Sequence, residues 1–270
     1  MPNHFADHED RTLPPKRPVL GVNVSQTNYD EVVDLVLAAA QSHQSMVVSL
    51  FAAHAVVTSS RDPELLAKVN NFEIVAPDGQ PVRWALNQLH GSALEDRVYG
   101  PELMLRSCAA AAQLGVGIYL YGGSPQVATD LPVKLQELFP GLEVVGSESP
   151  PYRALTAQEH ADFDTRVRES GAAIVFIGLG CPKQDEFAHT HRDRIPAVQV
   201  CVGAAFDFHA GTKEMAPSWM QDRGLEWAFR LGKEPKRLWR RYLVTNTQFA
   251  VGVARQRLTQ RSAPDRFIAR

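Results

Sequence analysis

Apolar and polar positions alternate along this chain in blocks that predict strands separated by helices. Short runs rich in β-branched and aromatic residues are typical of strands, whereas longer stretches with a helical repeat of apolar positions are typical of helices. Ile118–Tyr121 and Ile174–Ile177 are apolar throughout, as expected of strands that are covered on both faces. Strands are expected at Val19–Val24, Met46–Leu50, Phe72–Ala76, Val116–Tyr121, Leu142–Val145, Ala172–Ile177 and Val198–Val202. Helices are expected at Asn28–Gln41, Asp62–Asn70, Pro81–Leu89, Pro101–Gln113, Pro125–Phe139, Thr156–Glu169 and Lys183–His191.

This alternation predicts the fold class. Strands that alternate with helices of about 10–15 residues form mainly parallel sheets with helices on both faces. We therefore expect an α/β, Rossmann-like domain at residues 18–215, preceded by a disordered leader at 1–17. From about Ala216 aromatic residues are interspersed with basic ones, which predicts a basic, amphipathic helical appendage at 216–262 and a tail at 263–270.

The appendage contains two candidate helices, because Pro217 and Pro235 each suit a helical first turn. In the second helix a stripe of mostly apolar residues recurs every three or four positions. Its members are Trp239, Tyr242, Leu243, Asn246, Phe249 and Val253. A basic amphipathic helix with aromatic anchors is typical of interfacial membrane helices. The alternative is a C-terminal helix that packs on the sheet with its arginines in water.

Charge is distributed unevenly along the chain, although the net charge is only −2. Residues 213–270 hold 13 Lys and Arg against 5 Asp and Glu, a net of +8, which leaves −10 for residues 1–212. A basic tail suits phosphorylated ligands, nucleic acid or anionic lipid headgroups. The three cysteines form no Cys-x-x-Cys pair, so we expect neither a disulfide framework nor a zinc site. No apolar run reaches the roughly 18–20 residues that a spanning helix needs.

Residues that could bind a ligand or take part in catalysis follow the ends of the expected strands. The run Ile174–Ile177 is followed by Gly178 and Gly180, and Pro182 suits the start of the next helix. A helix N-terminus after a glycine turn attracts anions such as phosphate, and Lys183 and Gln184 lie at the same point. The alternative is an ordinary strand-to-helix turn.

Two other strands end in similar turns, at Asp78-Gly79 and Gly122-Gly123. Ligands of open α/β sheets bind at the carboxyl ends of the strands, so these turns mark one ligand-binding edge. Asp78 could accept a proton from a hydroxyl nucleophile there, although Asp-Gly is also a common turn. Asp207, between two phenylalanines, is interpreted as a buried structural carboxylate, and the alternative is a site residue.

Arginines of the appendage could hold a diphosphate, because guanidinium groups pair bidentately with phosphate oxygens. The candidates are Arg230, Arg237, Arg240 and Arg241. The alternative is that these charges are simply solvated. Asp162-Phe163-Asp164 lies in a polar helical stretch and the histidines are dispersed, so the sequence supports no metal site.

A series of short motifs in a fixed order resembles a known family. The motifs are Pro77-Asp78-Gly79-Gln80-Pro81-Val82, Arg97-Val98-Tyr99-Gly100-Pro101, Tyr121-Gly122-Gly123, Gly178 through Cys181-Pro182-Lys183-Gln184-Asp185-Glu186, Val202-Gly203-Ala204-Ala205-Phe206-Asp207-Phe208, Gly224-Leu225-Glu226-Trp227 through Arg230-Leu231, and Glu234-Pro235 through Arg237 to Arg240-Arg241-Tyr242. Together they resemble the WecG/TagA/CpsF family of bacterial glycosyltransferases, from about Leu20 to Tyr242.

The resemblance implies an inverting glycosyltransferase that needs no metal and no other cofactor. Such an enzyme moves a sugar from a UDP-sugar to a polyprenyl-diphosphate-linked saccharide at the cytoplasmic face of the cell membrane. It further implies Asp78 as the general base, Gln184 as an active-site contact, and three appendage arginines on the nucleotide diphosphate. With the turns described above, the expected binding residues are Gly79, Gly122, Gly123, Gly178, Gly180, Lys183, Gln184, Arg230, Arg237 and Arg240.

Two positions depart from the family pattern. Many members carry a Thr-x-Asn-like element after the second strand, where this chain has Ser49-Leu50-Phe51-Ala52-Ala53-His54. Many also have Arg-Ala-Pro at the entry to the appendage, where this chain has Met215-Ala216-Pro217. We therefore expect altered ligand contacts at Ser49 or His54 and one cation fewer near the phosphates.

The expected partners are a UDP-sugar, a lipid-linked saccharide and an anionic membrane surface rather than nucleic acid, and a homo-oligomer stays open. The protein is expected in the cytoplasm, peripheral at the inner face of the membrane. One alternative is a non-catalytic, membrane-associated nucleotide-binding protein. A Rossmann oxidoreductase is a weaker alternative, because no Gly-x-Gly-x-x-Gly follows the first strand.

Overall fold

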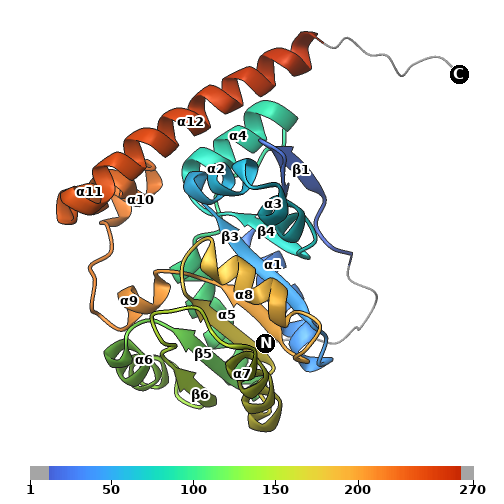
Figure 1. The fold of residues 1–270 in the computed structure, drawn as a ribbon, viewed down its shortest axis with the longest axis vertical. Coiled ribbons are helices and arrows are strands. Elements are labelled where there is room, and N and C mark those ends of the chain that lie inside the picture. Colours follow the sequence, from blue (N-terminus) through green and yellow to red (C-terminus); the bar gives the residue numbers. More distant parts are fainter. Residues whose placement is uncertain (1–11, 263–270) are drawn as a thin grey trace, which may run out of the picture.

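A six-stranded sheet forms the centre of the computed structural model, which describes residues 12–262 apart from the side chains of Arg237, Arg240, Arg241, Tyr242 and Ser262. Every neighbouring pair of strands is parallel, and the order is β4-β3-β8-β7-β5-β6. The strands are β3 (Met46–Phe51), β4 (Ile74–Pro77), β5 (Ile118–Gly122), β6 (Val144–Glu148), β7 (Ile174–Gly178) and β8 (Val198–Cys201). The predicted α/β, Rossmann-like fold is therefore confirmed (Figure 1).

Helices cover both faces of this sheet, because successive strand residues point to opposite sides. Val48 of β3 belongs to one apolar cluster and its neighbour Val47 to the other. The first face carries α1 (Tyr29–Gln41), α5 (Gly100–Leu114), α6 (Pro125–Leu138) and α9 (Ala205–His209). The second face carries α2 (Ala53–Arg61), α3 (Pro63–Asn70), α4 (Gln80–His90), α7 (Ala157–Ser170) and α8 (Lys183–His191).

Local capping explains why several helices begin where the sequence predicts. The Asn28 side chain accepts a hydrogen bond from the Glu31 amide at 3.0 Å at the start of α1. Asp62 caps α3 in the same way, and Thr156 forms a capping box with Glu159 at the start of α7. These interactions satisfy amide groups that have no partner inside the helix.

Several segments differ from the prediction. The short helix α9 was not expected, and the strand expected at Leu142–Val145 is displaced to Val144–Glu148. The strand expected at Val19–Val24 is an antiparallel hairpin of β1 (Lys16–Val19) and β2 (Val22–Ser25), which begins within the expected leader. The turn lies at Leu20 and Gly21, both at positive φ. Helix α2 was not predicted, because its N-cap position, Ala52, has no side chain that could mark a helix start.

The C-terminal segment forms α10 (Ser218–Asp222), α11 (Glu226–Lys233) and α12 (Pro235–Ser262). Helix α12 lies across α2 and α4 (Figure 1), and Gln256 near its end bonds the backbone of the β1–β2 hairpin. The stripe predicted along α12 divides into two parts. Phe249 and Val253 are buried against the domain, whereas Trp239 and Leu243 are 55% and 64% exposed. The C-terminal half of α12 therefore packs on the domain, whereas membrane binding through the exposed N-terminal half stays a prediction.

None of the helices within residues 12–262 is both long and apolar enough to cross a membrane. Residues 1–11 and 263–270, which include most of the expected leader and the tail, lie outside the described part of the chain.

Candidate active site

All six strands of the sheet end at the same side, which we call the carboxyl edge. Asp78 directly follows β4, Ala52 follows β3, and Gly203 lies just beyond β8. Gly122 and Gly178 are the last residues of β5 and β7. The three turns that the sequence singled out therefore lie along one edge, although they occupy different parts of it.

The turns after β5 and β7 are packed against each other. The amide of Gly123 donates to the carbonyl oxygen of Gly178 at 3.3 Å. A Cβ atom on Gly122 would lie 2.6 Å from the carbonyl group of Gly178, and one on Gly178 would lie 2.6 Å from the ring of Phe206. Both positions require glycine because the backbones and the ring approach too closely for any side chain.

Polar groups of the residues after β7 form hydrogen bonds within the protein instead of pointing toward a ligand. The amide of Gly180, which we expected to be free for an anion, donates to Oε1 of Gln184 at 3.0 Å. Gln184 is 4% exposed and therefore shapes this turn. Asp185 is buried and accepts a hydrogen bond from the Ser49 hydroxyl at 2.6 Å, and its burial raises its pKa to about 6. Ser49, expected near a ligand, instead anchors the start of α8.

A cavity of about 650 Å³ opens above these turns, and we call it the glycine-turn cavity. It is lined by Gly123 and Gly178, by the 150–155 loop, and by the first turns of α7 and α8. The Lys183 ammonium lies 5.2 Å from the centre of the Tyr152 ring. Asp207 lines the other side and pairs with Lys213 at 2.6 Å, so it is an ion-paired wall residue rather than a deeply buried one.

Asp78 lies in a smaller pocket of about 160 Å³, the Asp78 pocket. The domain and the appendage both contribute to its walls. The domain supplies Ala52, Ala53, His54, Asp78, Gly79, Gln80, Pro81, Arg97 and Tyr99, and the appendage supplies Gly224, Glu226, Trp227, Arg230 and Asn246. The site around Asp78 is thus complete only when the appendage is docked.

Charges of both signs meet in the Asp78 pocket. The Arg97 guanidinium donates to the Glu226 carboxylate and lies 4.3 Å from the centre of the Tyr99 ring. Arg97 is only 5% exposed, so this ion pair across the domain–appendage contact is shielded from water. Burial raises the pKa of Asp78 to about 6; Arg97 and Arg230 oppose the shift, and the Glu226 charge adds to it. Asp78 is therefore a stronger base than an ordinary aspartate.

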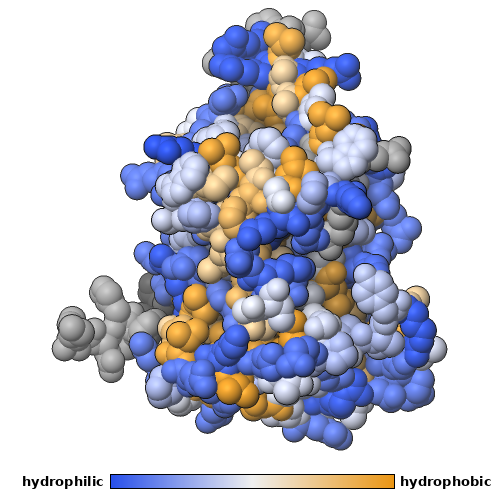
Figure 2. Space-filling view, turned by 90° about the vertical axis from the view of Figure 1, so that its left-hand side faces the viewer, coloured by the Kyte–Doolittle hydropathy of each residue, from blue (hydrophilic) through white to orange (hydrophobic). Residues whose placement is uncertain are grey.

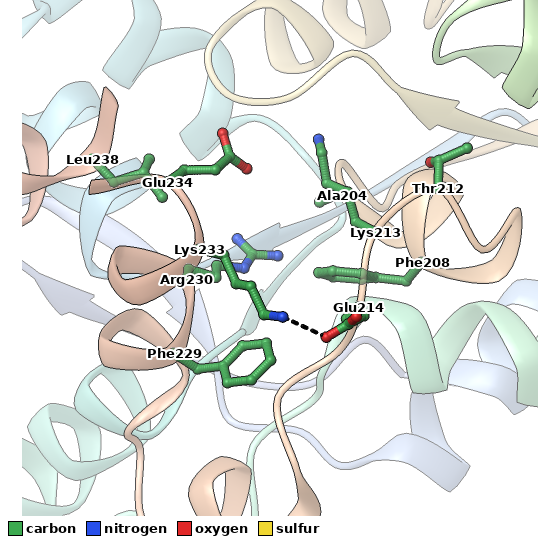
Figure 3. A pocket seen from close by; sticks show the side chains of 10 residues that line it. All are labelled: Ala204, Phe208, Thr212, Lys213, Glu214, Phe229, Arg230, Lys233, Glu234 and Leu238. Carbon is green, nitrogen blue, oxygen red and sulfur yellow. Dashed lines mark ion pairs between the residues drawn. The ribbon is translucent and has the colours of Figure 1, made fainter. Parts of the chain in front are cut away.

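A third hollow of about 330 Å³ lies beyond β8, and we call it the Arg230 pocket. Figure 3 shows side chains of α11 on one side of it and those of α9 and the following loop on the other. The Arg230 guanidinium lies 5.0 Å from the centre of the Phe208 ring, and Lys233 pairs with Glu214 at 2.7 Å. This pocket shares Arg230 with the Asp78 pocket and Lys213 with the glycine-turn cavity, so the three hollows adjoin.

Sequence reasoning missed two of the charged residues around Asp78. Arg97 and Glu226 were noted only as motif members, because nothing in their spacing indicates that a loop and an appendage helix meet. The side chains of Arg237 and Arg240, two expected phosphate contacts, lie outside the described residues. Among the described residues, no group of three or more His, Cys, Asp or Glu side chains is arranged to hold a metal ion.

Comparison with known families agrees with the motif order. Residues 17–263 match the model for the family described as "Glycosyl transferase WecG/TagA/CpsF family". The match covers both the domain and the appendage, and extends beyond the Leu20–Tyr242 range of the motifs. Because it spans nearly the whole chain, the protein belongs to the WecG/TagA/CpsF family of glycosyltransferases.

Proposed function

We propose that the protein is an inverting glycosyltransferase of surface polysaccharide synthesis. It would transfer a hexose or N-acetylhexosamine-type sugar from a UDP-sugar to a polyprenyl-diphosphate-linked saccharide. The observation that carries the proposal is the position of Asp78, a carboxylate of raised pKa in a pocket that a basic appendage completes. Residues 18–215 would form the catalytic domain and residues 216–262 the appendage.

Asp78 acts as the general base in this mechanism. It removes the proton of the acceptor hydroxyl while that oxygen attacks the anomeric carbon of the donor. The bond between the anomeric carbon and the diphosphate oxygen breaks from the opposite side, so the configuration inverts and UDP leaves with the electron pair. A carboxylate with a pKa of about 6 is mostly ionised at neutral pH and accepts a proton more readily than an ordinary aspartate.

The donor nucleotide occupies the glycine-turn cavity, and its diphosphate extends toward Arg230. Lys183 and Lys213 line the cavity, and Arg230 lines both the adjoining Arg230 pocket and the Asp78 pocket. Arg237 and Arg240 lie in α12, the helix that follows Arg230 and α11, and we propose that they also bind the diphosphate. These cations stabilise the charge on departing UDP, the task that a divalent ion performs in metal-dependent transferases.

The appendage also presents apolar side chains that suit a lipid-linked acceptor and a membrane surface. Trp227, Trp239 and Leu243 are 39%, 55% and 64% exposed, and with Leu231 they line a shallow hollow beside the Asp78 pocket. Figure 2 shows the face with α11, where apolar side chains lie among hydrophilic ones. We propose peripheral attachment to the inner face of the cell membrane through this surface and the surrounding basic residues.

The test is a panel of UDP-sugars with a short polyprenyl-diphosphate-saccharide acceptor, with and without EDTA. We expect one donor to give acceptor-dependent UDP release and a product heavier by one sugar residue, unaffected by EDTA. A strict requirement for Mn²⁺ or Mg²⁺ would contradict the metal-independent mechanism. UDP binding without transfer to any acceptor would favour a non-catalytic nucleotide-binding protein.

A further inference from the structure

Two histidines and a carboxylate form a hydrogen-bonded series between α7 and α8. His191 is fully buried, and its Nδ1 bonds the buried carboxylate of Asp164. Its other nitrogen, Nε2, lies 2.8 Å from Nδ1 of His160, one helical turn from Asp164 on α7. The mechanism above uses none of these three residues.

Packing holds the imidazole rings in this arrangement. The ring of Phe187 lies 4.2 Å from that of His191, centre to centre, and stacks on Tyr121 at 4.6 Å. Phe163 meets the His191 ring edge-on at 4.8 Å. An aromatic environment on several sides leaves the rings little freedom to rotate, so the hydrogen bonds keep a fixed direction.

The buried Asp164 carboxylate determines which atom donates in each hydrogen bond of the series. The Asp164 carboxylate only accepts, so His191 donates to it from Nδ1. Burial lowers the pKa of His191 against the pull of the Asp164 carboxylate, so the ring is neutral and its Nε2 carries a lone pair. His160 must then donate from Nδ1, and in the neutral imidazole this makes its own Nε2 an acceptor.

That free acceptor belongs to the glycine-turn cavity. His160 lines the cavity together with Gly123, Gly178 and Lys183. Within residues 12–262 no protein group bonds His160 Nε2, and this atom is not among the buried unpaired side-chain atoms. The atom is thus reached from outside the protein interior, at a cavity that is large enough for a nucleoside.

We propose that His160 Nε2 accepts a hydrogen bond from a ribose hydroxyl of the donor nucleotide. The inference rests on the proposed function, which places the nucleotide in this cavity. An acceptor nitrogen cannot form a hydrogen bond with an ionised phosphate oxygen, because both atoms only accept. It can accept a hydrogen bond from a hydroxyl group, and the ribose carries two hydroxyl groups. His191 and Asp164 are positioning residues, because they fix the tautomer that leaves Nε2 free.

Calorimetry with UDP, 2′-deoxy-UDP and 3′-deoxy-UDP tests the proposal on the wild type, His160→Phe and Gln158→Ala. Gln158 is exposed on the same helix, and among the described residues its side chain bonds only Asp162, so it serves as the control. The wild type and the control should bind one deoxy analogue about tenfold more weakly than UDP. His160→Phe should bind UDP and that analogue equally well. Discrimination that survives in His160→Phe would overturn the proposal.

A second measurement does not depend on the stability of the variant. Nitrogen NMR of the wild-type imidazoles should show His160 protonated at Nδ1 and not at Nε2 at neutral pH. The opposite tautomer would overturn the proposal. Failure of the wild type to bind UDP at all would instead refute the proposed function and this inference with it, so the two failures are distinguishable.

Discussion

Replacing Glu226 with glutamine should move the acid limb of the pH–rate profile to lower pH. The limb reports protonation of Asp78, whose pKa of about 6 lies above the ordinary value, so the enzyme loses activity as the pH falls through 6. The Glu226 charge helps to keep that pKa high and also occupies the Arg97 guanidinium. Without it, Arg97 and Arg230 stabilise the ionised form of Asp78 more strongly.

The expected size follows from the pKa. At a pKa of about 6 roughly 9% of Asp78 is ionised at pH 5 and roughly 91% at pH 7, so kcat/KM should rise about tenfold between them. Loss of one like charge should lower the pKa by about one unit. Glu226→Gln would then be about half ionised at pH 5, and its kcat/KM should rise only about twofold over the same interval.

Arg230→Gln is the matched control, because removal of a cation shifts the Asp78 pKa in the opposite direction. Its acid limb should move to higher pH, whatever happens to its maximal rate. The assay is acceptor-dependent UDP release at low donor concentration from about pH 4.5 to 8, with the melting temperature recorded at each pH. A wild-type rate that is flat between pH 5 and 7, or limbs that coincide in all three proteins, would refute this account of Asp78.

The remaining predictions concern stability and the appendage. Asp78→Asn should stabilise the fold by about 1–3 kcal/mol at pH 7 and not at pH 4. Burial disfavours the ionised carboxylate, and this cost is present at pH 7, above the folded-state pKa of Asp78, but not at pH 4, where the carboxyl is protonated in the folded state. Denaturant unfolding at both pH values checks this. Gly122→Ala should cost about 2–4 kcal/mol through its contact with the Gly178 backbone, whereas Gly232→Ala, with open space, should not; equal melting temperatures would contradict this. Arg230→Ala should lower kcat/KM in steady-state kinetics, by an amount that corresponds to about 2–4 kcal/mol of lost transition-state stabilisation. Truncation from Ala216 onward should abolish sedimentation with anionic liposomes; unchanged recovery would exclude attachment through the appendage.

The sheet and most helices could be predicted because their signals are local. The apolar run Ile174–Ile177 and the caps Asn28, Asp62 and Thr156 each act within a few residues. The β1–β2 hairpin was missed because Leu20, rather than a typical turn residue, takes a positive φ before Gly21.

The site was less predictable because its parts come from distant segments. Asp78 and the glycine turns follow from the rule that parallel strands end at one edge. The pairing of Arg97 with Glu226 joins residues 129 positions apart across the domain–appendage contact, and no periodic pattern encodes it. Gln184 and Ser49 were predicted to contact a ligand because they are polar and lie near the ends of strands. The structure shows that both side chains form hydrogen bonds within the protein instead.

The most direct test of the central claim compares acceptor-dependent UDP release by the wild type and Asp78→Asn, with UDP affinity measured in parallel. If Asp78 is the general base, the variant should bind UDP as tightly as the wild type and transfer sugar about 10²–10⁴ times more slowly. Transfer at a rate near that of the wild type would contradict the account, because the carboxylate at the carboxyl edge would then take no part in the reaction.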